Sequence, residues 1–283
     1  MLDTVQAILL GGLPGLTELF PVSSLGHTVL LPSVLGWSIN QHAEFFVIFL
    51  VATHLATALV LLAFFRADWI MIALGFFRSV RKGKIPKGDT YARLAWLLIT
   101  ATIPAGLLGL LFEHKLEEFF AAPFEVALFL IGNGALLYGA ELLRKRAKHL
   151  ADTEDADEAL AKLTFSKAIG IGFAQALALF PGFSRTGATL AGGLLAGLSH
   201  ASAARFSFLM ATPIIGAAAA LKLPKLIHAD ASTLWIVAIG TIVSAITAYI
   251  SVRFLTKYFK SHTLTPFAIY CVLAGILMLL VVR

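Results

Sequence analysis

The sequence predicts an all-α integral membrane protein, with six transmembrane helices and two re-entrant helical hairpins arranged in two inverted-topology repeats. Three observations lead to this fold class. Of the 283 residues, 59% are hydrophobic and only 13% are charged, with a mean hydropathy of +0.88. A soluble domain of this length would need far more polar surface. Apolar segments of about 20 residues recur, which is the length that crosses a hydrocarbon core of roughly 30 Å. A short polar motif also occurs twice in the chain.

Six apolar segments are each long enough to cross a bilayer once. They lie at roughly 44–65, 91–112, 124–143, 200–222, 232–255 and 263–282. Two further apolar regions, 3–36 and 165–198, are too long for one crossing and are interrupted by proline and glycine. We expect each to form two half-helices that enter the membrane and return on the same side. Such a backbone path is tolerated only where protein or a wet cavity surrounds it.

The basic residues predict the orientation in the membrane. The segments 66–93, 144–167 and 253–260 hold seven, six and three Lys/Arg, whereas the intervening ends hold few. Because basic loops tend to stay in the cytoplasm, these segments are expected inside and both termini outside. The formal charge of +6 therefore reflects membrane topology, and no nucleic-acid partner is expected. The acidic run at 152–158 is predicted to be a solvated part of a cytoplasmic linker.

An internal repeat divides the chain into two halves. The segment LFPVSSLGHTVL at 19–30 aligns without a gap with LFPGFSRTGATL at 179–190. At nearly the same offset, FLVAT at 49–53 matches FLMAT at 208–212. Each half is thus a broken hairpin followed by three spans. Because three is odd, the second half must be inserted upside down relative to the first.

This repeat predicts one polytopic domain over residues 1–283. Repeat one is expected at 1–143, a cytoplasmic linker at 144–164 and repeat two at 165–283. The two hairpins then enter from opposite faces, and their tips are expected to meet near the midplane of the membrane.

The two hairpin breaks carry polar residues that are unusual inside apolar segments. The first break contributes Glu18, Ser23, Ser24 and His27, and the second contributes Gln175, Ser184, Arg185, Thr186 and Thr189. Arg185 is the basic residue that falls in the interior of a predicted membrane segment. A charge there costs several kcal/mol unless it is paired or hydrated, which makes Arg185 a functional candidate. Its guanidinium fork suits phosphate oxygens.

Arginine, hydroxyl, imidazole and carboxylate groups together suit the cleavage of a phosphate ester. Arg185 would bind the phosphoryl group, and Glu18 could orient a histidine. Ser24 could attack, and His27, three residues later on the same helix face, could take or give the proton. Whether Ser24 or His27 makes the covalent attack stays open. The candidates for binding the phosphate are Ser23, Ser184, Arg185, Thr186 and Thr189, because a half-helix starting near Thr186 offers free N–H groups to an anion.

Structural roles compete with functional ones at these positions. Arg185 could simply pair with Glu18 and join the two hairpins. The hydroxyls, taken singly, are more often helix caps or bonded to their own backbone. His54 lies in mid-span, where a buried histidine held by a neighbour is an equal alternative to a site role. His54 and Gln175 are therefore secondary candidates.

At these residues the chain resembles the BacA-type undecaprenyl-diphosphatase family, integral membrane enzymes that recycle the bacterial cell-wall lipid carrier. The segment PGFSRTGAT at 181–189 is similar to the family's PGxSRxxxT signature, and LFPVSSLGH at 19–27 and PFAIY at 266–270 also match. The resemblance covers nearly the whole chain. It implies two re-entrant hairpins in inverted repeats, a location in the bacterial cytoplasmic (inner) membrane and an active site open to the outer face. It also carries site roles to Glu18, Ser23, Ser24, His27, Ser184, Arg185 and Thr189.

The chain departs from the family pattern at one position. The family has an acidic residue or glutamine four positions before the motif glutamate, and this chain has Pro14 there. Carboxylates at i and i+4 share a helix face and can hold a divalent cation between them. With that shared site lost, Glu18 stands alone as the candidate ligand for Mg²⁺ or Ca²⁺.

We therefore expect a membrane phosphatase that hydrolyses undecaprenyl diphosphate, or a related polyprenyl diphosphate, to the monophosphate and inorganic phosphate. Its expected partners are the lipid substrate and the bilayer, and a homodimer is left open. The alternatives are a transporter or flippase of polyprenyl phosphate, since inverted repeats with broken helices recur in transporters, and a phosphatase for another lipid phosphate. A membrane protein without a ligand would leave Arg185 beside the hydroxyls unexplained.

Overall fold

The computed structural model describes residues 2–41, 43–117, 122–146, 159–160 and 162–281. Over these ranges the chain is helical, and its only β-type pairing is an isolated bridge between Pro181 and Phe183. The acidic run predicted at 152–158, and most of the linker around it, lies outside the described residues. The helices are α1 (Thr4–Thr17), α2 (Ser24–Leu35), α3 (Glu44–Phe64), α4 (Arg66–Lys82), α5 (Thr90–Glu117), α6 (Pro123–Arg146), α8 (Phe165–Ala176), η2 (Leu177–Leu179), α9 (Arg185–Leu195), α10 (His200–Lys222), η3 (Leu223–His228), α11 (Ala231–Tyr258) and α12 (Thr265–Val281).

Five of the described helices are long and apolar enough to cross a membrane. They are α3, α10 and α11 over their full lengths, α5 over Thr90–Phe112 and α6 over Pro123–Lys145. These helices coincide with five of the six predicted spans. The sixth corresponds to α12, whose 17 residues rise about 25 Å, somewhat less than a hydrocarbon core of about 30 Å. The chain is thus an all-helical, multi-pass membrane protein, and the six-span arrangement stays a prediction.

The basic segment 66–93 contains a helix that the sequence analysis did not anticipate. In α4, Ile72, Gly75 and Ser79 are buried, while Phe77 is 67% exposed. The helix ends with basic residues in its last turn. An exposed apolar stripe on a helix with a basic end is typical of a helix at the membrane–water interface. The sequence did not reveal this helix because the charges of the segment resemble those of a loop.

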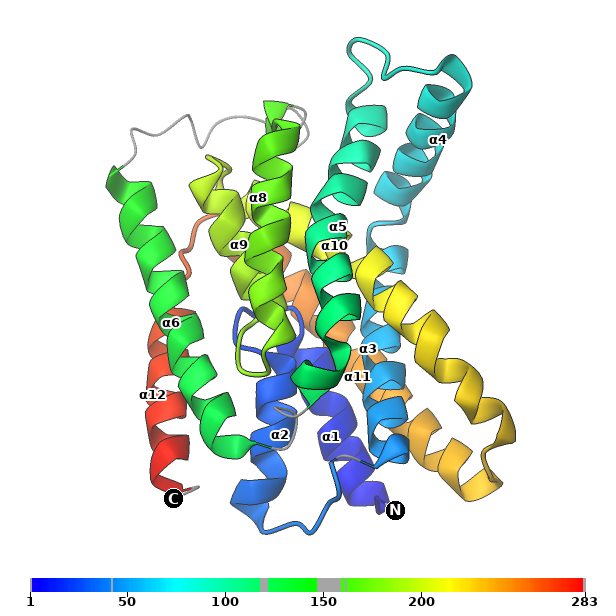
Figure 1. The fold of residues 1–283 in the computed structure, drawn as a ribbon, viewed down its shortest axis with the longest axis vertical. Helices are drawn as coiled ribbons and strands as arrows, with labels where there is room; N and C mark the ends of the chain where they lie inside the picture. The colour runs from blue at the N-terminus through cyan, green and yellow to red at the C-terminus, as the bar shows by residue number, and fades with distance from the viewer. Residues whose placement is uncertain (1, 42, 118–121, 147–158, 161, 282–283) are drawn as a thin grey trace.

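The two broken apolar regions fold as pairs of half-helices, α1–α2 and α8–α9. Figure 1 shows the two pairs entering from opposite ends of the molecule, with the turn of each near the middle of its long axis. The turns touch, because the backbone N–H of Gly182 donates to Ser23 Oγ at 3.1 Å. The two tips therefore meet, as the repeat predicts. The beginning of α1 and the end of α12 lie at the same end of the molecule (Figure 1).

The first helix of each pair packs against a long helix from the other half of the chain: α1 packs against α11, and α8 packs against α5. On α1, a Cβ at Gly11 or Gly15 would collide with the backbone of α11. On α8, a Cβ at Gly172 would collide with the Ala101 carbonyl of α5. Small residues allow such close approach between helices in a membrane, where packing rather than water drives association. These exchanged contacts hold the two turns against each other.

Candidate active site

Four polar side chains from both tips and from α3 form one connected cluster. The carboxylate of Glu18 accepts hydrogen bonds from Ser24 Oγ and, at 3.0 Å, from Nε of Arg185. Nε2 of His54 lies 3.2 Å from Ser24 Oγ and 3.2 Å from Glu18 Oε2. Glu18 and Ser24 are buried, and the side chains of His54 and Arg185 are only 14% and 12% exposed. The structure thus brings a hydroxyl, a carboxylate, an imidazole and a guanidinium together in a nearly closed space.

The first tip positions Ser24 through a helix cap. Ser23 is the N-cap of α2, and its Oγ accepts a hydrogen bond from the backbone N–H of Gly26 at 3.2 Å. Its φ of 68° is unusual for a residue other than glycine and turns the chain sharply into α2. Because Ser23 caps the helix, the hydroxyl of Ser24 is left for the cluster. Glu18 continues the last turn of α1, with its backbone N–H bonded to the Pro14 carbonyl at 2.8 Å.

The second tip positions Arg185 at the start of α9. Ser184 is the N-cap, and its Oγ accepts from the backbone N–H of Gly187 at 2.9 Å. Gly182, with a φ of 118°, lies so close to α6 that a Cβ would collide with the Val126 carbonyl. Among the described residues, Nη1 of Arg185 is buried and has no hydrogen-bond partner. A buried N–H without a partner in a native site needs an explanation, and an anionic ligand supplies one.

The two predicted histidines take different positions. His54 bonds through Nδ1 to the Leu50 carbonyl at 2.7 Å, which directs Nε2 towards Ser24. His27 has Nδ1 at 2.6 Å from the Ser23 carbonyl and Nε2 at 2.7 Å from the hydroxyl of Tyr270 on α12. Both ring nitrogens of His27 are therefore engaged away from Ser24. The side chain of His27 is thus directed to Tyr270 of α12, and the imidazole beside Ser24 is that of His54.

The remaining hydroxyls join the tips to each other and to α10. Thr186 Oγ1 donates to the Glu18 carbonyl at 2.8 Å, and Ser184 Oγ lies 3.3 Å from the Phe20 carbonyl. Thr189 Oγ1 bonds to Ser207 Oγ and to the Arg185 carbonyl. These are the caps and ties that the sequence allowed as alternatives, and the pairing of Arg185 with Glu18 is present as well. A structural contact and a role in a reaction are compatible at such positions.

Gln175 takes no part in these hydrogen bonds. It is buried on α8, and in the described part of the chain neither its oxygen nor its nitrogen has a hydrogen-bond partner. The structure also adds Asn133, on α6, which the sequence analysis did not single out. Its side chain bonds to both tips. A lone amide within a predicted span was the available signal, but no motif surrounds it.

The side chains around Glu18 offer few ligands for a divalent cation. No group of three or more His, Cys, Asp or Glu in the described ranges could hold a metal ion. Both oxygens of Glu18 already accept hydrogen bonds, and the guanidinium of Arg185 would repel a cation placed beside them. Pro14 is buried and offers no side-chain ligand. The residues present here therefore do not fit a Mg²⁺ or Ca²⁺ ion, which prefers several oxygen ligands.

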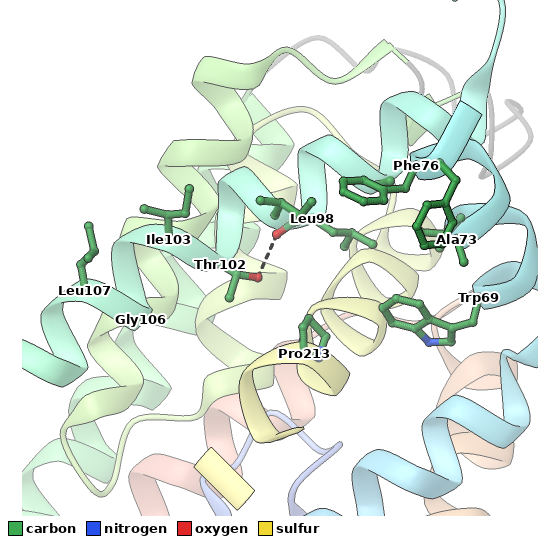
Figure 2. Close-up of a pocket in the computed structure, with 13 residues that line it drawn as sticks. Trp69, Ala73, Phe76, Leu98, Thr102, Ile103, Gly106, Leu107 and Pro213 are labelled. Carbon is green, nitrogen blue, oxygen red and sulfur yellow. Dashed lines mark hydrogen bonds between the residues drawn. The ribbon is translucent and has the colours of Figure 1, made fainter. Parts of the chain in front are cut away.

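A cavity of about 540 Å³ lies away from this cluster, between α4, α5 and α10 (Figure 2). Its lining is apolar apart from Thr102 and the indole nitrogen of Trp69, and Pro213 forms part of its wall. The hydroxyl of Thr102 is already bonded to the Leu98 carbonyl at 2.8 Å. The residues that line the cavity carry no charge, and their one hydroxyl is already bonded to the backbone, so its size does not make it the reaction site.

Comparison with known proteins places the chain in one family. The family model described as bacitracin resistance protein BacA matches residues 7–277. The chain is 46% identical to the undecaprenyl-diphosphatase of Mycolicibacterium paratuberculosis, over 97% of this chain and 95% of that protein. It is 47% identical to undecaprenyl-diphosphatase 2 of Chromobacterium violaceum, over 99% of both chains. It is 44% identical to the undecaprenyl-diphosphatase of Granulibacter bethesdensis, over 97% and 95%.

Proposed function

The chain belongs to the BacA family, and we propose that it hydrolyses undecaprenyl diphosphate to undecaprenyl phosphate and inorganic phosphate. One observation carries this proposal. The hydroxyl of Ser24 lies between the Glu18 carboxylate and the His54 imidazole, beside the buried guanidinium of Arg185. A hydroxyl next to a base, with an anion-binding group at hand, is the arrangement of an activated nucleophile.

In the first step, Ser24 Oγ attacks the terminal phosphorus of the diphosphate. A bond forms between Oγ and phosphorus, the bond from phosphorus to the bridging oxygen breaks, and undecaprenyl phosphate leaves. Nε2 of His54, 3.2 Å from Oγ, takes the proton. The carboxylate of Glu18, also 3.2 Å from Nε2, stabilises the imidazolium that results.

In the second step, water attacks the phosphorus of the phosphoserine. The bond from phosphorus to Oγ breaks, and Oγ recovers its proton from His54. The attacking water leaves one hydrogen on the released phosphate and gives the other to solvent. The same histidine therefore serves as base and then as acid, as is usual for covalent catalysis in two steps.

Arg185 and the start of α9 bind the phosphoryl group in this proposal. Nε of Arg185 stays with Glu18, while the unpartnered Nη1 is available for a phosphate oxygen. The first turn of α9 adds the partial positive charge of a helix N-terminus. Such fixed donors stabilise the charge that develops on the phosphoryl oxygens in the transition state.

The enzyme is proposed to lie in the bacterial cytoplasmic membrane with both termini outside and the site open to the outer face. The support is the distribution of charge along the molecule. The basic end of α4 lies at the opposite end of the molecule from the start of α1 and the end of α12 (Figure 1). Basic segments favour the cytoplasmic side.

The test uses purified protein in detergent with undecaprenyl diphosphate. We expect release of inorganic phosphate, and we expect Arg185→Ala to abolish it. Arg78→Ala is the matched control, because Arg78 is an exposed arginine paired with Asp89 far from the tips. Absence of phosphate release, with movement of labelled polyprenyl phosphate across liposomes containing the protein, would support transport instead.

We also propose that no divalent cation held by the protein takes part. After dialysis against EDTA, the wild-type protein should keep its activity and contain no bound Mg²⁺ or Ca²⁺ by elemental analysis. Pro14→Glu places a carboxylate one turn before Glu18, and this variant should gain measurable Ca²⁺ binding by calorimetry. Stoichiometric metal in the dialysed wild-type protein would contradict the proposal.

A further inference from the structure

Asn133 connects the two tips through the two ends of one amide group. Its Nδ2 donates to the Pro21 carbonyl at 2.9 Å, and its Oδ1 accepts from the backbone N–H of Ser184 at 3.0 Å. The second N–H of the amide has a partner in Cys271 Sγ, at 3.3 Å. Asn133 is completely buried on α6. A buried amide with every donor and its oxygen engaged holds its neighbours in a defined geometry.

The two backbone groups that Asn133 binds are close in sequence to the reacting groups. Pro21 lies in the turn between Glu18 and Ser24, and Ser184 directly precedes Arg185. The peptide planes at these positions belong to turns, so neither group is satisfied by a helix or sheet ladder. The Asn133 amide therefore acts together with the direct bonds from Gly182 to Ser23 and from Thr186 to Glu18 in setting the distance between the two turns. It does so from a third element, α6, that belongs to neither tip.

The second tip is also held rigidly against α6 by its glycine. Gly182 packs so closely on α6 that a Cβ would meet the Val126 carbonyl and Phe129. This contact fixes the second tip on the helix, and Asn133 then fixes the first tip relative to it. We propose that Asn133 is a positioning residue for the phosphatase reaction: it aligns Ser24 with the phosphoryl group bound by Arg185. This proposal rests on the proposed function.

The decisive variant is Asn133→Asp, because its carboxyl changes its hydrogen bonds with pH. When protonated, the carboxyl can donate to the Pro21 carbonyl and accept from Ser184, as the amide does. When ionised, it can only accept, and the bond to Pro21 is lost. We expect the kcat of N133D relative to wild type to be close to one at low pH and to fall at least tenfold as pH rises. KM should change much less, since misalignment affects the reacting geometry.

A second variant, Asn133→Leu, keeps the branched shape of the side chain but removes its hydrogen bonds to both tips, and it should lower kcat about 100-fold. Ser79→Ala is the matched control, since it removes a buried hydrogen bond between α4 and α5, from Trp96 Nε1, away from the tips. Its kcat should equal that of wild type. If N133L does not fold, the pH dependence of N133D still decides. The inference would be overturned if the kcat of N133D relative to wild type did not depend on pH, or if folded N133L had the kcat of wild type. A wild-type protein that releases no phosphate would instead overturn the proposed function.

Discussion

The two hairpin tips begin from the same sequence motif and end with different chemistry. The gapless alignment of 19–30 with 179–190 makes Ser24 the counterpart of Ser184. Ser184 is an N-cap, and its hydroxyl is occupied by the backbone N–H of Gly187. Ser24 is the first residue of its helix, because Ser23 takes the capping position. A shift of the cap by one residue therefore converts a structural hydroxyl into one that faces a carboxylate and an imidazole.

The charged groups also differ between the two tips. The first tip brings the carboxylate of Glu18, and the position that matches Arg185 is Leu25. The second tip brings the guanidinium and has Ala178 where the first has Glu18. Neither tip alone holds both the carboxylate and the guanidinium. The two copies of the motif therefore contribute different groups to the proposed site.

The largest effect should separate the two equivalent serines. Ser24→Ala removes the proposed nucleophile and should reduce phosphate release by roughly 10³-fold or more. Ser184→Ala should retain most of the activity of the folded protein, because a cap can be lost without removing a reacting group. Initial rates with undecaprenyl diphosphate measure both. Equal losses in the two variants would remove the distinction between the tips.

The next effect tests which helix supplies the base. The first hairpin contacts His54 of α3. When the repeated segments FLVAT and FLMAT are aligned, the residue of α10 that corresponds to His54 is Pro213. His54→Gln should lower kcat about 100-fold, since general base catalysis contributes on that order. His27→Gln, which removes a bond to Tyr270, should lower it less. A pH–rate profile for each variant checks the assignment, and a greater loss in H27Q would return the proton transfer to His27.

The smallest effect concerns stability, where the Ser184 variant, and not the Ser24 variant, should show the greater loss. Ser184→Ala should reduce the free energy of unfolding by ~1 kcal/mol, the usual cost of a lost N-cap. Ser24→Ala leaves the cap at Ser23 in place and should change it less. Unfolding in SDS titrations, followed by circular dichroism, compares the two. If S24A were the less stable protein, Ser24 rather than Ser23 would be the effective cap of α2.

Much of the fold could be predicted because lipid imposes strong constraints. Apolar length identified the spans later seen as α3, α5, α6, α10 and α11. The sixth predicted span corresponds to α12, whose 17 residues fall just short of the length of a full crossing. The breaks at 18–23 and 180–184 were visible because proline and glycine interrupt the apolar pattern there. The amphipathic α4 was not predicted, since its charges resemble those of a cytoplasmic loop.

Most residues of the proposed site could also be recognised in the sequence, but the contacts between them could not. Glu18, Ser24 and Arg185 stood out as polar residues in apolar surroundings, and they do meet. Helical spacing favoured His27 as the partner of Ser24, because spacing reports only neighbours on the same helix. His54 comes from another helix, and Asn133 acts from a third, so local sequence contains no signal that places them at the tips.

The amino-acid pattern alone indicated a membrane protein, a repeat of its two halves, and polar groups gathered at two breaks. These properties follow from composition and periodicity, which each segment expresses alone. The packing of the helices was needed to distinguish the hydroxyl that caps a helix from the one that contacts the carboxylate and the imidazole. It also decided which histidine faces that hydroxyl and which amide spaces the tips. Those outcomes depend on how α3, α6 and the two hairpins pack, and packing joins residues that lie far apart in the chain.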